Sequence, residues 1–424
     1  MMNDAVKKLF WGWWVVVVCS FVTLYGAGVF HYGFGVLVKP IVSELGWSMA
    51  LASGAFSLYR LESGAMAPLA GFLIDRIGPR KVVSLGAILM GSGFICLSQV
   101  KTVLPFYLSF LIISTGFGFS TSNIVGTSLI SKWFIRKRGR ALGLYSGLTG
   151  VGGLLVPILS HFVILYGWRT TVLILGPVTW LIVLPLTLFL RRTPEEHGLL
   201  PDGESSAETP EIPGLSSSMK IQEINFSVKK AMCMPSYWLL AVCFSAFQLT
   251  NSAIFVHLVP YLMTVGFEAH PAAFVVSFVT AGSVLGRVGF GWLSDVLSKT
   301  TLLMICFLAQ FIAILILIQV RRDDSILYVI SFILAFGCTY GGLSVLRPTT
   351  VAEFYGRDKF GTIWGFLQGI SVFGGVAGPV VVGLIYDLQK SYRLGLIFLS
   401  LTNLLAAFVI MFLKRSASGK ECIR

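Results

Sequence analysis

The sequence predicts an all-α polytopic membrane protein with twelve transmembrane helices in two pseudo-symmetric bundles of six. Hydrophobic residues make up 55% of the 424-residue chain and charged residues only 12%, whereas soluble proteins carry about 25% charged residues. The mean hydropathy is +0.83. The apolar residues also gather in long segments, and the second half of the chain repeats features of the first.

Each expected span is a segment of about 20 mainly apolar residues, because backbone polar groups must pair with one another inside lipid. Several tryptophans fall near the segment ends, as is typical of side chains at a membrane interface. The twelve expected spans are 13–37, 48–73, 82–99, 104–129, 140–165, 169–190, 236–262, 272–295, 301–319, 327–346, 361–386 and 392–413.

The basic residues predict the orientation. The loops on one side, together with both termini, hold 23 of the 32 Lys and Arg residues, and the loops on the other side hold 7. The other two, Arg60 and Arg287, are expected within spans. Basic loops remain in the cytoplasm, so both termini are expected to be cytoplasmic in a plasma or inner membrane.

One long loop divides the chain into a bundle at 1–190, a linker at 191–235 and a bundle at 236–424. The linker is rich in Pro, Ser and acidic residues, so we expect it to be disordered or loosely held. Its end, FSVKKAMCMPSYW, predicts a short helix at the membrane surface.

An internal repeat relates the two bundles. GFLID at 71–75 matches GWLSD at 291–295, and GLYSGLTGVGGLLVP at 143–157 matches GFLQGISVFGGVAGP at 365–379. Five Gly and Pro positions of the longer pair coincide, which indicates duplication of a six-helix unit. Two such halves joined by a loop are the plan of a secondary transporter, which binds its cargo near the bilayer midplane.

Other classes of protein lack support in the sequence. The net charge of +13 is spread over short loops rather than gathered in a nucleic-acid-binding patch. The seven cysteines show no CxxC spacing, so neither a zinc site nor a disulfide framework is expected. GxxxxGK[ST], GxSxG and HExxH are absent, so we expect neither an ATPase nor an enzyme, and no cofactor or metal.

Three segments resemble a known family. GFLIDRIGPRK at 71–81 is similar to the signature loop of the major facilitator superfamily. WGWWVVVV at 11–18 and WFIRKRGRALGLYSGLTGVGG at 133–153 resemble signatures of its monocarboxylate transporters and oxalate–formate exchangers. The resemblance implies the major facilitator fold and transport of a small carboxylate by a protein expected to be monomeric.

Two arginines are candidate anion-binding residues, since guanidinium forms paired hydrogen bonds with carboxylate and stays charged when buried. With Asp75 and Asp295 as markers of one membrane edge, Arg287 lies ~12 Å and Arg60 ~22 Å into a core of ~30 Å. The resemblance implies that Arg287 binds the carboxylate, because monocarboxylate transporters carry such an arginine in the eighth span. An ion pair with another span is the alternative for Arg60.

Glu62 is the candidate proton carrier, as the only carboxylate deep within an expected span. Permanent pairing with a buried arginine is the equal alternative. His31 is a second candidate for proton coupling or cargo binding, with a packing role as its alternative. Weaker candidates for cargo binding are Tyr32, Asn251, Tyr340 and Gln368.

A cytoplasmic latch is predicted around the signature loop, where Asp75 can pair with nearby bases in one conformation and release them in another. Alternatively, the basic residues near this loop only set the orientation of the protein in the membrane. The latch residues are Gly71, Asp75, Arg76, Gly78, Arg80 and Arg138.

The predicted function is therefore secondary transport of small organic anions by alternating access, coupled to a proton. Exchange of anions without a proton is the alternative. The resemblance leaves both open, because animal monocarboxylate transporters have an aspartate where this chain has Ser283. A membrane-embedded enzyme and a transporter-like receptor are the remaining readings.

Overall fold

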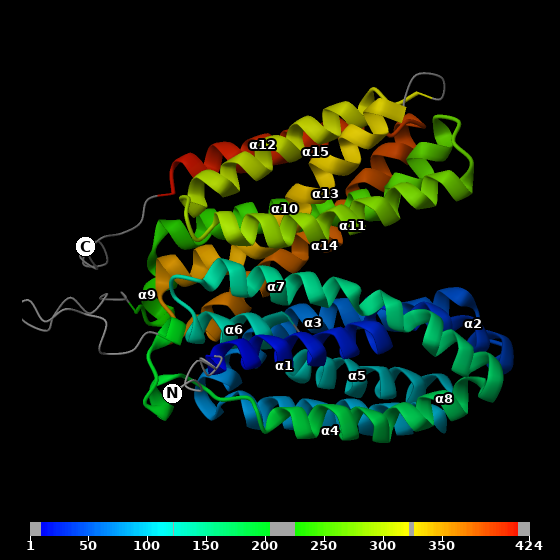
Figure 1. Cartoon of the computed structure of the whole chain (residues 1–424). Coiled ribbons are helices and arrows are strands. Elements are labelled where there is room, and N and C mark those ends of the chain that lie inside the picture. The colour runs from blue at the N-terminus through cyan, green and yellow to red at the C-terminus, as the bar shows by residue number, and fades with distance from the viewer. Residues whose placement is uncertain (1–9, 122, 204–224, 322–325, 414–424) are drawn as a thin grey trace, which may run out of the picture. The chain divides into compact units, whose positions relative to one another are not determined.

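The computed structural model describes residues 10–121, 123–203, 225–321 and 326–413, and these residues contain helices and no strand. They form two compact units (Figure 1). Unit 1 comprises Met1–Asn225 with Gly356–Gly361, and unit 2 comprises Phe226–Tyr355 with Thr362–Arg424. Residues 204–224 of the predicted linker lie outside the described residues.

The helices of unit 1 follow the predicted spans, with local breaks. The third and fourth helices of the chain are joined by Gly78, whose φ of 85° ends α3 and lets α4 begin with Pro79. The longer elements are α1 (Trp11–Gly26), the π-helix η1 (Ala27–Tyr32), α2 (Phe34–Leu45), α3 (Met49–Ile77), α4 (Pro79–Ser98), α5 (Val103–Ser120), α6 (Asn123–Trp133), α7 (Arg138–Gly150), the 3-10 turn η2 (Val151–Leu154) and α8 (Leu155–Thr187).

The described residues of unit 2 form six long helices and one short one. The short helix confirms the one predicted before the seventh span, and the Ser227 hydroxyl caps it by accepting the Lys230 N–H at 3.4 Å. The elements are α9 (Val228–Cys233), α10 (Pro235–Thr264), α11 (Ala269–Leu293), α12 (Lys299–Ile318), α13 (Ile326–Tyr355), α14 (Phe360–Gln389) and α15 (Arg393–Met411). The first two residues of α14 group with unit 1.

The predicted all-α fold of twelve spanning helices is confirmed. Ten helical stretches of the described residues are long and apolar enough to cross a membrane. One of these, Arg138–Thr187, makes two spans because Gly167 interrupts it with a φ of 75°. The 29-residue helix α3, which carries Arg60 and Glu62, is the remaining span.

The prediction that the tenth span ends at residue 346 is wrong. Helix α13 continues to Tyr355, and Arg347 and Pro348 are buried inside it. A charged residue followed by proline is a sequence signal for a helix end. Neighbouring helices can compensate for a proline inside a membrane helix, so the helix continues.

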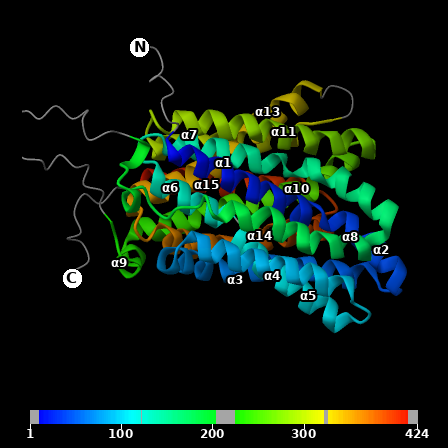
Figure 2. The same cartoon turned by 60° about the horizontal axis from the view of Figure 1, so that its bottom comes forward.

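A seam of glycines packs α11 against α13, and Figure 2 shows these two helices side by side. A Cβ atom at Gly286 would lie 1.9 Å from the Cys338 carbonyl oxygen, and one at Gly341 would lie 2.0 Å from that of Ser283. Small residues of this kind let helix backbones approach closely in membranes. The seam fixes Arg287 on α11 level with the middle of α13.

Candidate functional site

The centre of unit 2 contains an aromatic pair with a guanidinium beside it. Tyr340 on α13 stacks on Phe247 of α10, with 5.9 Å between ring centroids and 10° between ring planes. The half-buried Arg287 on α11 places its guanidinium carbon 5.9 Å from the Tyr340 ring centroid. A cation over an aromatic face is attracted to the ring. The structure thus brings together Arg287 and Tyr340, two of the residues predicted to bind cargo.

A second guanidinium lies on the other member of this aromatic pair. Arg347 is 5% exposed, and its guanidinium carbon is 4.0 Å from the Phe247 ring centroid. Its Nε donates to the Leu343 carbonyl and its Nη1 to Gln368 Oε1, both at 3.3 Å. The predicted spans, which end at 346 and resume at 361, place Arg347 in a cytoplasmic loop, and this placement is wrong because Arg347 lies inside α13. The seven-residue spacing from Tyr340, two helical turns, was a signal that the two residues share a face.

The two weaker predictions in unit 2 have different surroundings. Gln368 on α14 contacts Arg347 through its side-chain oxygen. Asn251 on α10 is 4% exposed, and its Nδ2 donates to the Phe247 carbonyl at 2.7 Å. Its Oδ1 is buried and accepts no hydrogen bond from the described residues. Asn251 thus contacts Phe247 of the aromatic pair, and Gln368 contacts Arg347, which lies on the Phe247 ring.

Glu62 in unit 1 is surrounded by hydroxyl groups. The Thr115 hydroxyl of α5 donates to Glu62 Oε1 at 2.6 Å, and the neighbouring Ser114 hydroxyl donates to Oε2. No Lys, Arg or His nitrogen of the described part of the chain lies within ion-pair distance of this carboxylate. Among the described side chains, the partners of Glu62 are thus hydroxyl groups, not the buried arginine that was the alternative partner. Neither Ser114 nor Thr115 is among the site residues predicted from the sequence.

His31 lies in the π-helical segment η1 between α1 and α2. Its Nδ1 is 3.2 Å from the Tyr59 hydroxyl on α3, and its ring packs edge-on against Tyr32 with 5.1 Å between centroids. Tyr32 is 41% exposed. Single turns of π-helix occur often at functional sites, and here the turn directs the imidazole toward α3.

Helix α3 also carries Arg60, whose side chain lies outside the described part of the structure. Its backbone is helical, two residues before Glu62. Two residues along a helix correspond to a rotation of about 200°. Positions 60 and 62 therefore lie on nearly opposite faces of α3, and the contacts of Arg60 stay a prediction.

The predicted latch contains a buried ion pair. Lys132 Nζ of α6 lies 2.7 Å from Asp75 Oδ1 of α3, and the two side chains are 5% and 2% exposed. A Cβ atom at Gly361 would lie 3.1 Å from the same Asp75 oxygen and 2.9 Å from the Gly71 carbonyl. The segment 356–361 thus lies against the Asp75 end of α3.

The remaining latch residues form a second group around this pair. Arg138 is 4% exposed and donates from Nε to the Phe134 carbonyl and from Nη2 to the Ser131 carbonyl. Arg76 and Arg80 are exposed, and the Arg76 guanidinium lies 5.8 Å from the Phe72 ring centroid. Arg138 therefore holds the end of α6, whereas Arg76 and Arg80 face outward.

The first part of the predicted linker is held in place, which differs from the expected loose loop. The Asp202 carboxylate accepts the backbone N–H groups of Ile135, Arg136 and Lys137 at 2.9–3.0 Å. Glu195 forms an ion pair with Arg357 at 2.5 Å. A carboxylate is favoured by the unpaired N–H groups before a helix, and here it precedes α7. The description of the whole linker as loose is wrong for residues 191–203.

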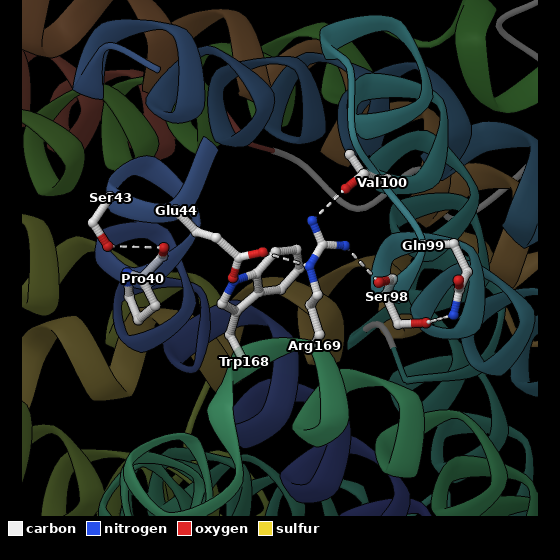
Figure 3. Close-up of polar contacts among 8 residues, drawn as sticks. All are labelled: Pro40, Ser43, Glu44, Ser98, Gln99, Val100, Trp168 and Arg169. Carbon is white, nitrogen blue, oxygen red and sulfur yellow. Dashed lines mark hydrogen bonds and ion pairs between the residues drawn. The ribbon is translucent and has the colours of Figure 1, made fainter. Parts of the chain in front are cut away.

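The opposite end of unit 1 has a polar cluster that joins three helices (Figure 3). Arg169 on α8 donates from Nε to Glu44 of α2 at 2.6 Å and from Nη1 and Nη2 to the Ser98 and Val100 carbonyls at 2.8 Å. Trp168 Nε1 donates to the other Glu44 oxygen at 2.5 Å. A surface cavity of about 430 Å³ lies beside this cluster. The guanidinium satisfies carbonyls at the end of α4 that the helix leaves unpaired.

The Glu44 contacts predict a dependence of stability on pH. The hydrogen bond from Arg169 holds the pKa of the Glu44 carboxyl below its ordinary value of 4.5. The stabilisation is therefore present above about pH 4.5 and is lost as the pH falls through the lowered pKa. We expect Glu44→Gln to cost less than about 1 kcal/mol at pH 6, since the pair is exposed.

Thermal unfolding of purified protein at pH 6 and at pH 3.5 tests this expectation. The difference between wild type and Glu44→Gln should be measurable at pH 6 and smaller at pH 3.5, because the carboxyl is protonated as the pH falls through its lowered pKa. In the matched background Arg169→Gln, where Glu44 keeps its hydrogen bond from Trp168, the Glu44 substitution should have a smaller effect at pH 6. A difference that grows on acidification would contradict the prediction.

No group of three or more His, Cys, Asp and Glu residues in the described ranges could hold a metal ion. The described polar clusters instead suit two other chemistries. The guanidinium groups of unit 2 can bind an anion through charge-assisted hydrogen bonds. The carboxylate of Glu62 among hydroxyls can accept and release a proton.

A comparison with protein families and known relatives supplies an independent observation. The model of the family described as Major Facilitator Superfamily matches residues 14–379. The chain is 27% identical to the uncharacterized MFS-type transporter YcxA of Bacillus subtilis, with 90% of each chain covered. It is 24% identical to mouse monocarboxylate transporter 12, over 95% of this chain and 85% of the relative.

Two further proteins extend the comparison. The oxalate:formate antiporter of Oxalobacter formigenes is 21% identical, over 87% of this chain and 84% of the relative. Among solved structures, the fucose:proton symporter of E. coli superposes with a TM-score of 0.71, at 14% identity over 95% of this chain and 98% of the symporter. At this identity the second likeness concerns the fold alone.

Proposed function

Because the chain belongs to the major facilitator superfamily, we propose that it transports small carboxylate anions across a membrane by alternating access, together with a proton. It is a multi-pass membrane protein of a transporter family. In alternating access, the protein exposes the bound cargo first to one side of the membrane and then to the other. The proposed cargo agrees with the names of two relatives, a monocarboxylate transporter and an oxalate:formate antiporter.

The observation that carries the proposal is the position of Arg287. It lies six residues before the end of α11, or ~9 Å along the helix, and its guanidinium stands over the Tyr340 ring. An arginine within a membrane span is costly and marks a functional site. Its planar group binds a carboxylate through two parallel hydrogen bonds. An anionic cargo can therefore bind to this guanidinium.

Proton coupling is proposed for Glu62, with His31 as a second titratable group. Glu62 is held by hydroxyls that can donate to its ionised form. The same hydroxyl oxygens can accept a hydrogen bond when the carboxyl is protonated. Both protonation states are thus accommodated without a change of partners. In the competing hypothesis of anion exchange, Glu62 would not titrate during transport.

The orientation is also a proposal. The end of unit 1 that carries Asp75, Lys132 and Asp202 is assigned to the cytoplasm, because the basic loops lie at this end. The Glu44–Arg169 cluster is then on the outer side. The proposed latch therefore faces the cytoplasm, and the Glu44–Arg169 cluster, with its dependence on pH, faces the outside.

Uptake into proteoliposomes tests the proposed function. A panel of labelled carboxylates at two external pH values should show saturable uptake that rises at the lower pH. Arg287→Gln is expected to reduce this uptake about 100-fold, since the variant keeps a polar side chain but loses the charge. Arg321→Gln, at an exposed position outside the helices, is the matched control and should retain uptake.

The same assay separates the competing hypotheses. Uptake that requires an internal anion and does not depend on pH would favour exchange and remove the role of Glu62. Transport of only uncharged or cationic compounds, or unchanged uptake by Arg287→Gln, would contradict the proposed function. Conversion of the added compound into a product would instead indicate an enzyme.

A further inference from the structure

Arg347 occupies a different level of unit 2 from Arg287. The seam between α11 and α13 defines the levels, because a Cβ atom at Gly341 would lie 2.9 Å from the backbone nitrogen of Arg287. Arg287 is thus anchored level with Gly341. Arg347 follows Gly341 by six residues on α13, which corresponds to ~9 Å along the helix. The two arginines are therefore anchored about 1.7 helical turns apart.

The Arg347 guanidinium packs against aromatic rings and neutral hydrogen-bond acceptors rather than against a carboxylate. Its guanidinium carbon lies 4.0 Å from the Phe247 ring centroid and 5.8 Å from those of Phe244 and Trp364. Its hydrogen bonds go to a carbonyl and to the neutral amide of Gln368, both at 3.3 Å. No carboxylate of the described residues lies within 4.0 Å of it.

A buried cation without an acidic partner requires compensation. Burying a charge is costly unless it is paired and hydrogen-bonded. Ring contacts and a long hydrogen bond to an amide supply only part of this. The guanidinium has five N–H donors, and two of them have acceptors within unit 2. The remaining donors and the uncompensated charge suit an anionic group of a ligand.

We propose that Arg347 binds a second acceptor group of the transported anion, while Arg287 binds its carboxylate and Gln368 orients the Arg347 guanidinium. This inference rests on the proposed function and specifies its cargo. Two guanidinium groups anchored at levels ~9 Å apart favour a cargo that offers acceptor oxygens at two positions over one with a single carboxylate. The cargo is therefore an anion with oxygen acceptors at two positions, such as a hydroxy-, oxo- or dicarboxylate. Simple fatty acids such as acetate lack the second acceptor.

Selectivity in the full-length protein tests this inference. In proteoliposomes, Arg347→Gln is expected to raise KM for lactate, pyruvate or oxalate at least tenfold and to change that for acetate less than threefold. Arg347→Lys keeps the charge without the planar fork and should give an intermediate loss. A uniform reduction of kcat for all anions, or an unchanged selectivity, would overturn the assignment.

A second variant covers the case in which Arg347→Gln does not fold. Gln368→Glu places a carboxylate within reach of Arg347, where it should compete with the cargo. We expect tenfold or greater loss of affinity for the two-acceptor anions together with an unchanged or raised melting temperature. Gln368→Leu is the matched control, which removes the amide without adding a charge and should weaken binding less. Full affinity in Gln368→Glu would contradict the proposal.

The outcomes also separate this inference from the proposed function. If wild-type protein transports no carboxylate, both fail. If Arg287→Gln abolishes uptake but Arg347→Gln leaves the ratio of lactate to acetate affinity unchanged, only the role of Arg347 fails. Wild-type protein that accepts acetate as well as lactate and oxalate would likewise overturn the two-acceptor cargo while the proposed function stands.

Discussion

Replacing Asp75 with alanine is expected to lower the free energy of unfolding by about 3–5 kcal/mol, because Lys132 would be left with an uncompensated charge in a buried position. The two side chains are 2% and 5% exposed and lie 2.7 Å apart. Lys132→Ala should have a similar effect for the same reason. The double variant is expected to be less destabilised than the sum of the two single variants, since neither buried charge remains. Chemical unfolding of the wild type, the two single variants and the double variant in detergent gives the free energies of unfolding for this double-mutant cycle.

A partly exposed ion pair in unit 2 is the control for this expectation. Lys299 of α12 and Glu353 of α13 lie 2.5 Å apart, with 19% and 28% of their side chains exposed. The coupling energy of this pair should be smaller than that of Asp75 with Lys132, because solvent screens it. Equal coupling in both pairs, or an additive cycle at Asp75, would contradict the account of the buried pair.

The latch prediction extends to transport. Asp75 Oδ1 and the Gly71 carbonyl lie close to where a Cβ atom at Gly361 would stand, and Arg357 donates to the Lys132 carbonyl at 3.0 Å. The segment 356–361 is therefore held at the same end of unit 1 as the ion pair. If opening requires this segment to leave, variants at Asp75 would alter the rate of transport more than the affinity for cargo.

Much of this fold follows from composition and spacing. Long apolar segments predict spanning helices, because lipid offers no partners to backbone groups. Arg287 and Glu62 were identifiable as charges within such segments. Arg347 was not, since an arginine followed by a proline is a sequence signal for a helix end. Only packing against α10 and α14 shows that the helix continues around it.

Other features depend on contacts between distant segments, which no local pattern encodes. Ser114 and Thr115 become partners of Glu62 only when α5 packs against α3. Asp202 belongs to a stretch whose composition is typical of disorder, yet its carboxylate accepts three backbone N–H groups more than 60 residues away along the chain. The π-helical segment that holds His31 replaces part of a largely apolar run that was expected to form one regular helix. The sequence predicts which elements exist, and tertiary packing determines the partners of their polar groups.

Replacing Gly286 with alanine is expected to destabilise the protein by about 1–3 kcal/mol and to reduce transport about 100-fold. The added Cβ atom would lie 1.9 Å from the Cys338 carbonyl oxygen. Because this neighbour is backbone, α11 and α13 would have to move apart by about an ångström, and Arg287 would then shift relative to Tyr340. Melting temperature and carboxylate uptake of the purified variant measure the two effects.

Gly289 is the matched control on the same helix, because a Cβ atom there meets no other atom within 4 Å. Gly289→Ala should retain transport and should raise stability by up to about 1 kcal/mol, because alanine has the higher helix propensity. If the substitution at Gly286 is as harmless as that at Gly289, close packing of the seam does not position Arg287. If both variants lose transport equally, the effect belongs to the helix as a whole and the steric argument fails.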